Sequence, residues 1–333
     1  MTIRFATFAA VLALAAGPAL AQTAIKPAVT FDVGGKFDKS FNEASYTGAE
    51  AFKKKTGIAY REFEVQNDAQ REQAFRRFAR DGQDPIIATG FSNGAALKKV
   101  AEEFPKTRFT IIDFVIDLPN VQSIVFKEHE GSYLVGLLAA KASKSGKVGF
   151  VGGMDIPLIR KFACGYVQGV KAGNPAAEII QNMTGTTGAA FNDPVKGGEL
   201  AKSQMDRGAD VIYHAAGATG IGVLRAVADA GKLGIGVDSN QNALQPGKVL
   251  TSMLKRVEVA VENTLMQAHE GKWKPGVTVL GLAEGGVAWA LDDHNKGLIT
   301  DAMKAAAAKA EADIKSGAIK VHDYMSDQKC PVQ

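Results

Sequence analysis

After Pro27, short β-branched or aromatic runs alternate strictly with amphipathic stretches of helical period, and this alternation limits the possible folds more than any other feature. Ten runs are predicted as strands, at residues 28–33, 61–65, 85–89, 108–113, 122–126, 147–151, 178–183, 211–214, 233–237 and 249–253. Eight stretches are predicted as helices, at residues 41–55, 68–80, 93–104, 131–142, 159–174, 193–207, 221–230 and 256–269. Such alternation is typical of α/β proteins, in which helices cover both faces of parallel sheets.

The predicted strands are suited to complete burial. Phe109-Thr110-Ile111-Ile112 and Val148-Gly149-Phe150-Val151 carry almost no polar residue, as expected of central strands in a parallel sheet. Ten strands could form one doubly wound sheet, but 333 residues exceed the roughly 150 typical of one domain. Two sheets of five or six strands, one in each of two lobes, fit the length better. A further helix is expected over 296–315.

The N-terminus has the anatomy of a cleaved secretory signal. Arg4 precedes an apolar run over 5–16, and the small residues Ala19 and Ala21 close it just before Gln22. The run is too short to span a bilayer, which needs roughly 20 apolar residues. Cleavage is expected after Ala21, so that 1–21 is a signal peptide. No cysteine stands near this site to carry a lipid, and the expected product is a soluble periplasmic protein.

Two cysteines, Cys164 and Cys330, remain after cleavage. In an oxidising compartment such a pair can form a disulfide, which would join the C-terminal tail to a helix far back in the sequence. The alternative is one buried thiol and one thiol on the tail. We favour the disulfide, because an exposed thiol in an exported protein is reactive.

Several function classes lack their sequence signatures. The 39 Lys and Arg residues are interspersed with 35 Asp and Glu residues, which gives no basic patch for nucleic acid. The five histidines show no zinc spacing, and Gly-x-Gly-x-x-Gly does not occur. We therefore expect a binding protein and not an enzyme, with no metal or cofactor.

Polar residues and glycines follow the predicted strands, where open α/β sheets bind their ligands. The residues at these ends are Asp32, Gly90, Asn93, Asp113, Gly217, Gly220 and Asp238. Each carboxylate could instead cap a strand end or form an ion pair. Phe41 and Phe191 lie in loops of different halves and could sandwich a flat ring, although either could equally be a core residue. Ser40 or Asn42 could cap the helix that starts near Phe41.

Six stretches together resemble one family, the basic membrane proteins, which are substrate-binding proteins of ABC transporters and include purine nucleoside receptors. The matching stretches are DVGGKFDKSFN (32–42), FTIID (109–113), GFVGG (149–153), GATGIGV (217–223), IGVDSNQ (235–241) and VLTSMLKR (249–256). They follow the family's order and span nearly the whole chain after the signal.

The resemblance implies a type I periplasmic-binding-protein fold, two doubly wound parallel-sheet lobes joined by a three-strand hinge, with a nucleoside in the cleft. The lobes implied are 25–126 plus 254–278 and 127–253 plus 279–333. The ligand-binding residues implied are Asp32, Phe41, Asn42, Asp113, Phe191, Gly217, Asp238 and Lys255. Phe162 competes with Phe191 for its role, and Lys255 could instead form a salt bridge between the lobes.

The implied partners are a small-molecule ligand, most simply a purine nucleoside, and the permease and ATPase of an importer; a monomer suffices for docking on the permease. The chain departs from the family's pattern at His214, where a small or apolar residue is usual, and in lacking the lipid-bearing cysteine. Two alternatives remain open. The protein could sense its ligand for a membrane receptor, or bind another solute such as a free base or a flavin.

Overall fold

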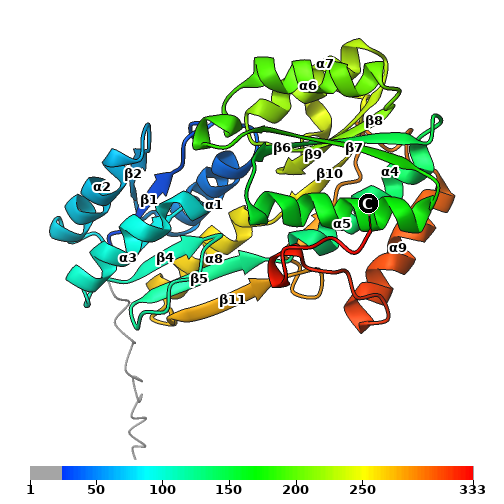
Figure 1. Ribbon diagram of the computed structural model, residues 1–333. Helices are drawn as coiled ribbons and strands as arrows, with labels where there is room; N and C mark the ends of the chain where they lie inside the picture. The colour runs from blue at the N-terminus through cyan, green and yellow to red at the C-terminus, as the bar shows by residue number, and fades with distance from the viewer. Residues whose placement is uncertain (1–24, 333) are drawn as a thin grey trace, which may run out of the picture.

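The structure is a computed structural model that describes residues 25–332, and the predicted signal peptide lies outside the described residues. Its strands form two six-stranded sheets, one in each lobe (Figure 1). The first sheet contains β1 (Ala28–Phe31), β2 (Arg61–Glu64), β3 (Ile86–Ala88), β4 (Phe109–Ile112), β5 (Val121–Phe126) and β11 (Gly276–Leu280). The second contains β6 (Lys147–Met154), β7 (Glu178–Gly185), β8 (Val211–Ala215), β9 (Leu233–Asp238), β10 (Val249–Lys255) and β12 (Val287–Trp289).

The two sheets have the same strand order. They run β2-β1-β3-β4-β5-β11 and β7-β6-β8-β9-β10-β12, and every pair is parallel except β10 with β12. In each sheet the order reverses direction once, between β1 and β3 or between β6 and β8, which is the arrangement of a doubly wound fold. The predicted α/β class with two parallel-sheet lobes is confirmed.

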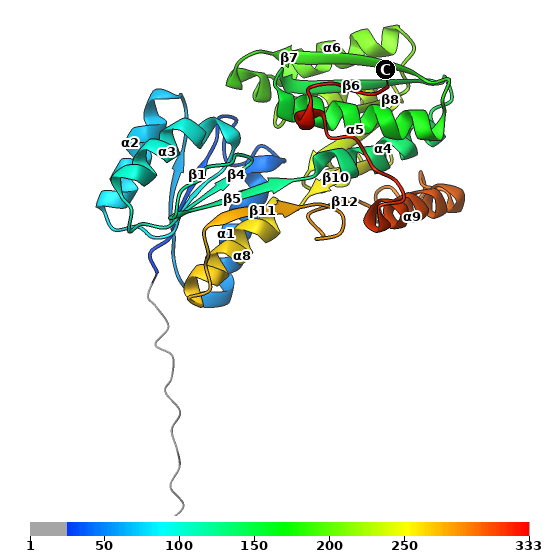
Figure 2. The same ribbon diagram turned by 60° about the horizontal axis from the view of Figure 1, so that its bottom comes forward.

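Helices cover both faces of each sheet (Figures 1 and 2). The α-helices are α1 (Phe41–Thr56), α2 (Ala69–Arg80), α3 (Gly94–Glu103), α4 (Glu128–Ala142), α5 (Pro157–Gly173), α6 (Pro194–Asp206), α7 (Thr219–Asp229), α8 (Val257–His269) and α9 (Asp301–Ser316). α1 pairs with α8 and α2 with α3 in the first lobe, while α4 pairs with α5 and α6 with α7 in the second. Each of these nine helices within residues 25–332 is too short or too polar to cross a membrane.

The α4–α5 pair is packed so closely that it depends on glycines. A Cβ at Gly136 would collide with the backbone carbonyl of Tyr166, and one at Gly169 with that of Tyr133. The close packing fixes α5, whose first turns face the space between the lobes, against α4, which starts at the hinge.

The chain passes between the lobes three times. It crosses at Lys127 between β5 and α4, at Arg256 between β10 and α8, and through residues 281–286 between β11 and β12. β10 stays in the second sheet as far as Lys255, and β11 stays in the first as far as Leu280. The exact lobe boundaries given above stay a prediction.

The C-terminal segment is fastened to the second lobe. The predicted disulfide is confirmed, because Cys164 in α5 and Cys330 are bonded. We call residues 317–332 the C-terminal strap; it includes the 3₁₀ turn η4 (Tyr324–Ser326), which packs on α5 and is drawn in red in Figures 1 and 2. α9 begins at Asp301 and not near 296, since the hydroxyl of Thr300 accepts the Met303 amide and caps the helix there.

Candidate functional site

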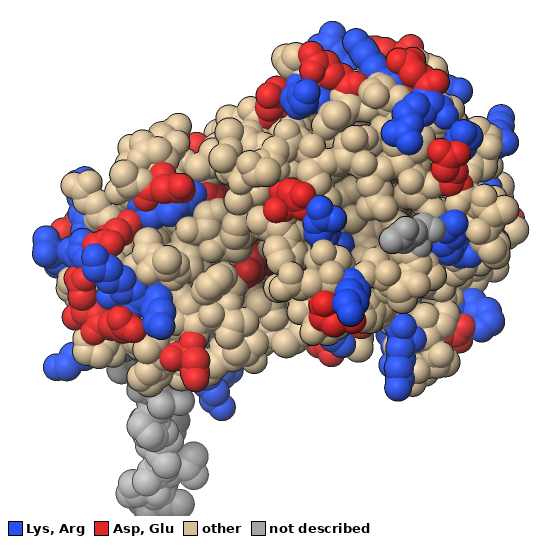
Figure 3. All heavy atoms as spheres, viewed as in Figure 1, with Lys and Arg blue, Asp and Glu red and all other residues tan. Residues whose placement is uncertain are grey.

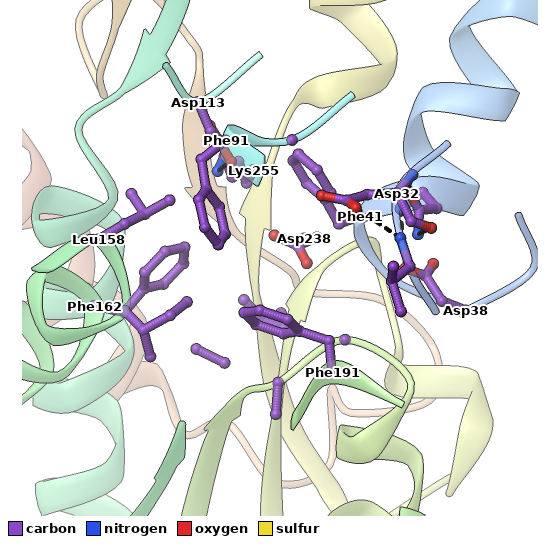
Figure 4. Close-up of a pocket in the computed structure, with 18 residues that line it drawn as sticks. Asp32, Asp38, Phe41, Phe91, Asp113, Leu158, Phe162, Phe191, Asp238 and Lys255 are labelled. Carbon is purple, nitrogen blue, oxygen red and sulfur yellow. Dashed lines mark hydrogen bonds and ion pairs between the residues drawn. The ribbon is translucent and has the colours of Figure 1, made fainter. Parts of the chain in front are cut away.

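A cavity lies between the two sheets, at the carboxyl ends of their strands. Its empty space is about 580 Å³, which includes part of its open mouth. All eight residues predicted to bind ligand line it: Asp32, Phe41, Asn42, Asp113, Phe191, Gly217, Asp238 and Lys255. Figure 4 shows that the labelled side chains converge on this space from both lobes. That these residues contact a ligand stays a prediction.

Strand ends position the carboxylates of the site. Asp32 follows β1 and Asp113 follows β4 in the first lobe, while Asp238 ends β9 and Lys255 ends β10 in the second. The backbone is left-handed at Asp113 (φ 70°) and Asp238 (φ 61°). Aspartate tolerates this conformation better than most residues, and such strain is concentrated at functional sites.

Four phenylalanine rings lie in the apolar part of the wall. Phe41 starts α1, Phe91 follows β3, Phe162 lies in α5 and Phe191 ends the 3₁₀ turn η2 (Gly188–Phe191). The rings of Phe91 and Phe191 meet edge to face, with centroids 6.4 Å apart. Phe162 and Phe191 both line the cavity, so the choice between them as the ligand-binding ring stays open. Phe91 was missed, although it directly follows Gly90 at a strand end.

The loop before α1 is held by its own side chains. The Asp32 amide donates to Asn42 Oδ1 (2.9 Å) and Asn42 Nδ2 donates to the Asp32 carbonyl (3.1 Å). The buried carboxylate of Asp38 accepts the amides of Ser40, Asn42 and Glu43. Asp38, and not Ser40 or Asn42, therefore caps α1. Burial raises the pKa of Asp38 to about 6 despite these three hydrogen bonds.

Asp32 has a charged partner that the sequence did not reveal. Arg71 in α2 is buried, and its Nη2 lies 2.7 Å from Asp32 Oδ1. Its Nη1 donates to Asn93 Oδ1 (2.9 Å). Arg71 thereby links the segment that follows β3 to the segment that follows β1. Gly90 lets the two ends approach, because a Cβ there would lie 2.5 Å from Asp32 Oδ2.

Lys255 forms the salt bridge between the lobes that was the alternative to a ligand contact, and it also lies at the cavity. Its Nζ donates to Asp113 Oδ2 in the other lobe (2.5 Å). Its second partner is Glu128 at the start of α4, with Nζ 2.9 Å from Oε1. The rings of Phe41, Phe126 and Phe162 surround the ammonium group at 5.0 to 5.6 Å, within the range of cation–π attraction.

The buried carboxylates have different ionisation behaviour. Burial raises the pKa of Asp113 to about 6, although Lys255 opposes this, and it raises the pKa of Asp238 to about 6 as well. Burial would also raise the pKa of Glu128, but Lys255 and Lys161 outweigh it and hold that pKa at about 2. Asp113 Oδ1 is buried in the cavity wall without a hydrogen-bond donor. The site therefore presents acceptor oxygens and little free positive charge.

Hydrogen bonds join the lobes beside Asp238. Ser40 Oγ donates to Asp238 Oδ2 (2.5 Å), Ser239 Oγ donates to the Ser40 carbonyl (3.0 Å), and Gln241 Nε2 donates to the Lys39 carbonyl (2.9 Å). These three hydrogen bonds hold the first and second lobes together beside the cavity.

His214 does not reach the cavity. Its Nε2 lies 2.9 Å from Gln241 Oε1, and its ring packs so tightly on Gly220 that a Cβ there would collide with it. Burial lowers the pKa of His214 to about 4, so the ring is neutral at pH 7. The departure from the family's pattern at this position thus supports Gln241 and does not alter the cavity wall.

Comparisons with known proteins agree on the class of protein. The profile of the Bmp family, described as ABC transporter substrate-binding protein PnrA-like, matches residues 25–324. An ABC transporter nucleoside-binding protein, BmpA, of Lactococcus lactis is 33% identical, with 90% of each chain covered. A lipoprotein of Pyrococcus furiosus is 36% identical over 80% of this chain and 71% of its own.

A solved structure supports the same assignment. The crystal structure of an ABC transporter solute-binding protein from Aeropyrum pernix superposes with a TM-score of 0.84 and 29% identity, covering 90% of this chain and 94% of the other. The fold, the six motifs in order and the profile match all agree. The chain belongs to the Bmp family of ABC transporter substrate-binding proteins.

Proposed function

We propose that the protein captures a purine nucleoside in the cavity between its lobes and delivers it to the permease of an ABC importer. The observation that carries this proposal is the composition of the cavity wall, which combines four phenylalanine rings with buried aspartates that still offer acceptor oxygens, among them the unpartnered Asp113 Oδ1. The relative in Lactococcus lactis whose name specifies nucleoside binding supports it.

The chemistry of the wall selects a flat, neutral ligand that is rich in hydrogen-bond donors. Aromatic rings stack on a base, at about 1–3 kcal/mol per base in single-strand binders. Ionised carboxylates accept hydrogen bonds but cannot donate them, so they suit ribose hydroxyls and ring N–H groups. A phosphate would meet carboxylates of like charge, which disfavours nucleotides.

We propose roles for the site residues that take account of the contacts they already make. Asp32 is already paired with Arg71 and Asn42 is occupied by the Asp32 backbone, so both are better placed to shape the loop. Asp238 keeps one carboxylate oxygen beyond its bond to Ser40, and we assign it to the ribose hydroxyls. Asp113, with its unpartnered Oδ1, is assigned to a donor on the ring edge. Phe41 and Phe191 would stack on the base.

Transport adds requirements outside the cavity. We propose export through a signal peptide cleaved after Ala21 and a periplasmic protein without a lipid anchor, since both cysteines form the disulfide.

The lobes would open and close about the three crossings, and the permease would recognise the closed form. Charged side chains of both signs are interspersed over the face shown in Figure 3, available for polar contacts with a membrane partner. The protein would act as a monomer and perform no chemistry on its ligand.

We expect purine nucleosides to raise the melting temperature of protein that has been unfolded, stripped of ligand and refolded. A ligand at 100 times its Kd adds about 2.7 kcal/mol to the free energy of unfolding, because it binds the native state alone. Differential scanning fluorimetry against nucleosides, free bases, sugars, amino acids and flavins checks this, with calorimetry on each hit. A response to sugars or amino acids without nucleosides would contradict the proposed ligand class.

We also expect nucleoside affinity to fall by about tenfold for each participating carboxylate between pH 7.5 and pH 5. Asp113 and Asp238 have pKa values of about 6, and only their ionised forms accept two donors. Binding should therefore favour the ionised form and release protons near pH 6. Calorimetry with inosine in buffers of different ionisation enthalpy measures this release. Constant affinity without proton release would show that neither carboxylate accepts from the ligand.

A further inference from the structure

Five charged side chains form a continuous row that starts buried in the cavity wall and ends at a partly exposed carboxylate outside it. Asp113 Oδ2 is 2.5 Å from Lys255 Nζ, and Lys255 Nζ is 2.9 Å from Glu128 Oε1. Glu128 Oε2 is 3.0 Å from Lys161 Nζ, and Lys161 Nζ is 3.6 Å from Asp323 Oδ2. The signs alternate along the row, so each lysine lies between two carboxylates.

The inner members of the row are shielded from water. The side chains of Lys255 and Glu128 are 2% and 1% exposed, that of Lys161 is 7% exposed, and that of Asp323 is 36% exposed. Buried charges must be paired, because taking an ion out of water costs several kcal/mol that only close partners offset. The position of Lys255 thus depends on Glu128, and the position of Glu128 depends on Lys161.

The row passes through the first hinge crossing. Glu128 is the first residue of α4, directly after Lys127. Lys161 also donates to the carbonyl of Phe126, the last residue of β5 (2.7 Å), while the Phe126 ring lies 5.1 Å from the Lys255 ammonium. Lys161 therefore holds together α5 of the second lobe and the end of a first-lobe strand.

The last member belongs to the C-terminal strap, which is fixed on α5 at three places. The Cys164–Cys330 disulfide holds its far end. Gln168 exchanges two hydrogen bonds with the backbone of His322, at 2.8 and 3.1 Å. These contacts place Asp323 over Lys161 and also 3.9 Å from His129 Nδ1. None of the strap residues lines the cavity.

We propose that Glu128, Lys161 and Asp323 are positioning residues for the ligand site: through Lys255 they set the geometry of the Asp113 carboxylate, and the strap is part of the binding apparatus although it lies outside the cavity. The inference rests on the proposed function, in which Asp113 accepts a hydrogen bond from the ligand. It predicts that a substitution on the strap changes ligand affinity, and that this change depends on Glu128.

The test uses the full secreted chain with its disulfide intact and inosine as the probe, measured by calorimetry at pH 7.5. Asp323→Asn should weaken inosine binding by about threefold to tenfold, since coupling between members of one ionic network has that size. Asp323→Glu, which keeps the charge, should bind within about twofold of the unmodified protein. The matched control is Asp327→Asn, a strap carboxylate that contacts His322 and not Lys161, and it should bind like the unmodified protein.

A double-variant cycle separates positioning from a general structural role. In a Glu128→Gln background the row is interrupted, so Asp323→Asn should weaken inosine binding no further. The single variants alone can overturn the proposal. They would do so if Asp323→Asn left inosine binding unchanged, or if Asp323→Asn and Asp327→Asn weakened it equally. Should neither inosine nor any other purine nucleoside bind the unmodified protein, the proposed function is wrong. In that case the same cycle is measured on the unfolding equilibrium constant. Additive effects of Asp323→Asn and Glu128→Gln would show that the two side chains are not coupled and would refute the proposal.

Discussion

Lys255→Met is expected to lower the free energy of unfolding by about 3–5 kcal/mol, the cost of leaving a buried charge without its partner. Methionine keeps most of the volume of the lysine stem, so the loss measures the charge and not a void. Asp113 would have no counterion, whereas Glu128 would keep Lys161 at 3.0 Å. Guanidinium denaturation of ligand-free protein at pH 7.5 measures the effect.

Two comparisons make the Lys255 result specific. Burial raises the pKa of Asp113 above its value in the unfolded chain, and without Lys255 nothing opposes this effect. Protonation of Asp113 therefore stabilises the folded variant at low pH, and this stabilisation is lost as the pH rises. The deficit relative to unmodified protein should therefore be smaller at pH 5 than at pH 7.5. Asp113→Asn combined with Lys255→Met should recover part of the loss. A deficit independent of pH and unrelieved in the double variant would mean that packing, and not charge, is responsible.

The fold was accessible from the sequence because its determinants are local. Buried parallel strands are apolar and helices carry apolar residues at three- and four-residue spacing, so all ten predicted strands and all nine predicted helices are present. β11 and β12 were missed for a physical reason. Both lie at sheet edges. Val277 and Val279 of β11 are exposed, so β11 lacks the apolar burial of the central strands, and β12 has only three residues.

The site was accessible only in part. Residues at strand ends and in the motifs could be named, and the structure brings them to one cavity. Their partners could not, because Arg71 and Glu128 carry no local sign of the contacts that they make across the fold. Arg71 lies on an amphipathic helix among exposed arginines, and Glu128 starts a helix, where an acidic residue is common for dipole reasons alone. Long-range pairing of charges is a property of the tertiary structure.

Asp238→Ala is expected to reduce nucleoside affinity by about 2–4 kcal/mol, or roughly 30- to 900-fold, with a smaller effect on the fold. The carboxylate is buried between the aromatic rings, as Figure 4 shows, so hydrogen bonds to it are charge-assisted and water cannot replace them. Calorimetry with the best nucleoside from the ligand screen measures the loss.

Two further variants separate the ligand contact from the other roles of Asp238. Its backbone is left-handed, a conformation that strains alanine but that asparagine tolerates, so Asp238→Asn tests the charge without the strain. Ser40→Ala removes the hydrogen bond between the lobes at Asp238 and leaves the carboxylate in place. If the carboxylate accepts the ribose hydroxyls, Asp238→Asn should lose most of the affinity that Asp238→Ala loses, and Ser40→Ala much less. If Ser40→Ala matches Asp238→Ala instead, the residue acts by holding the lobes closed, and the ribose contact must be assigned elsewhere in the cavity.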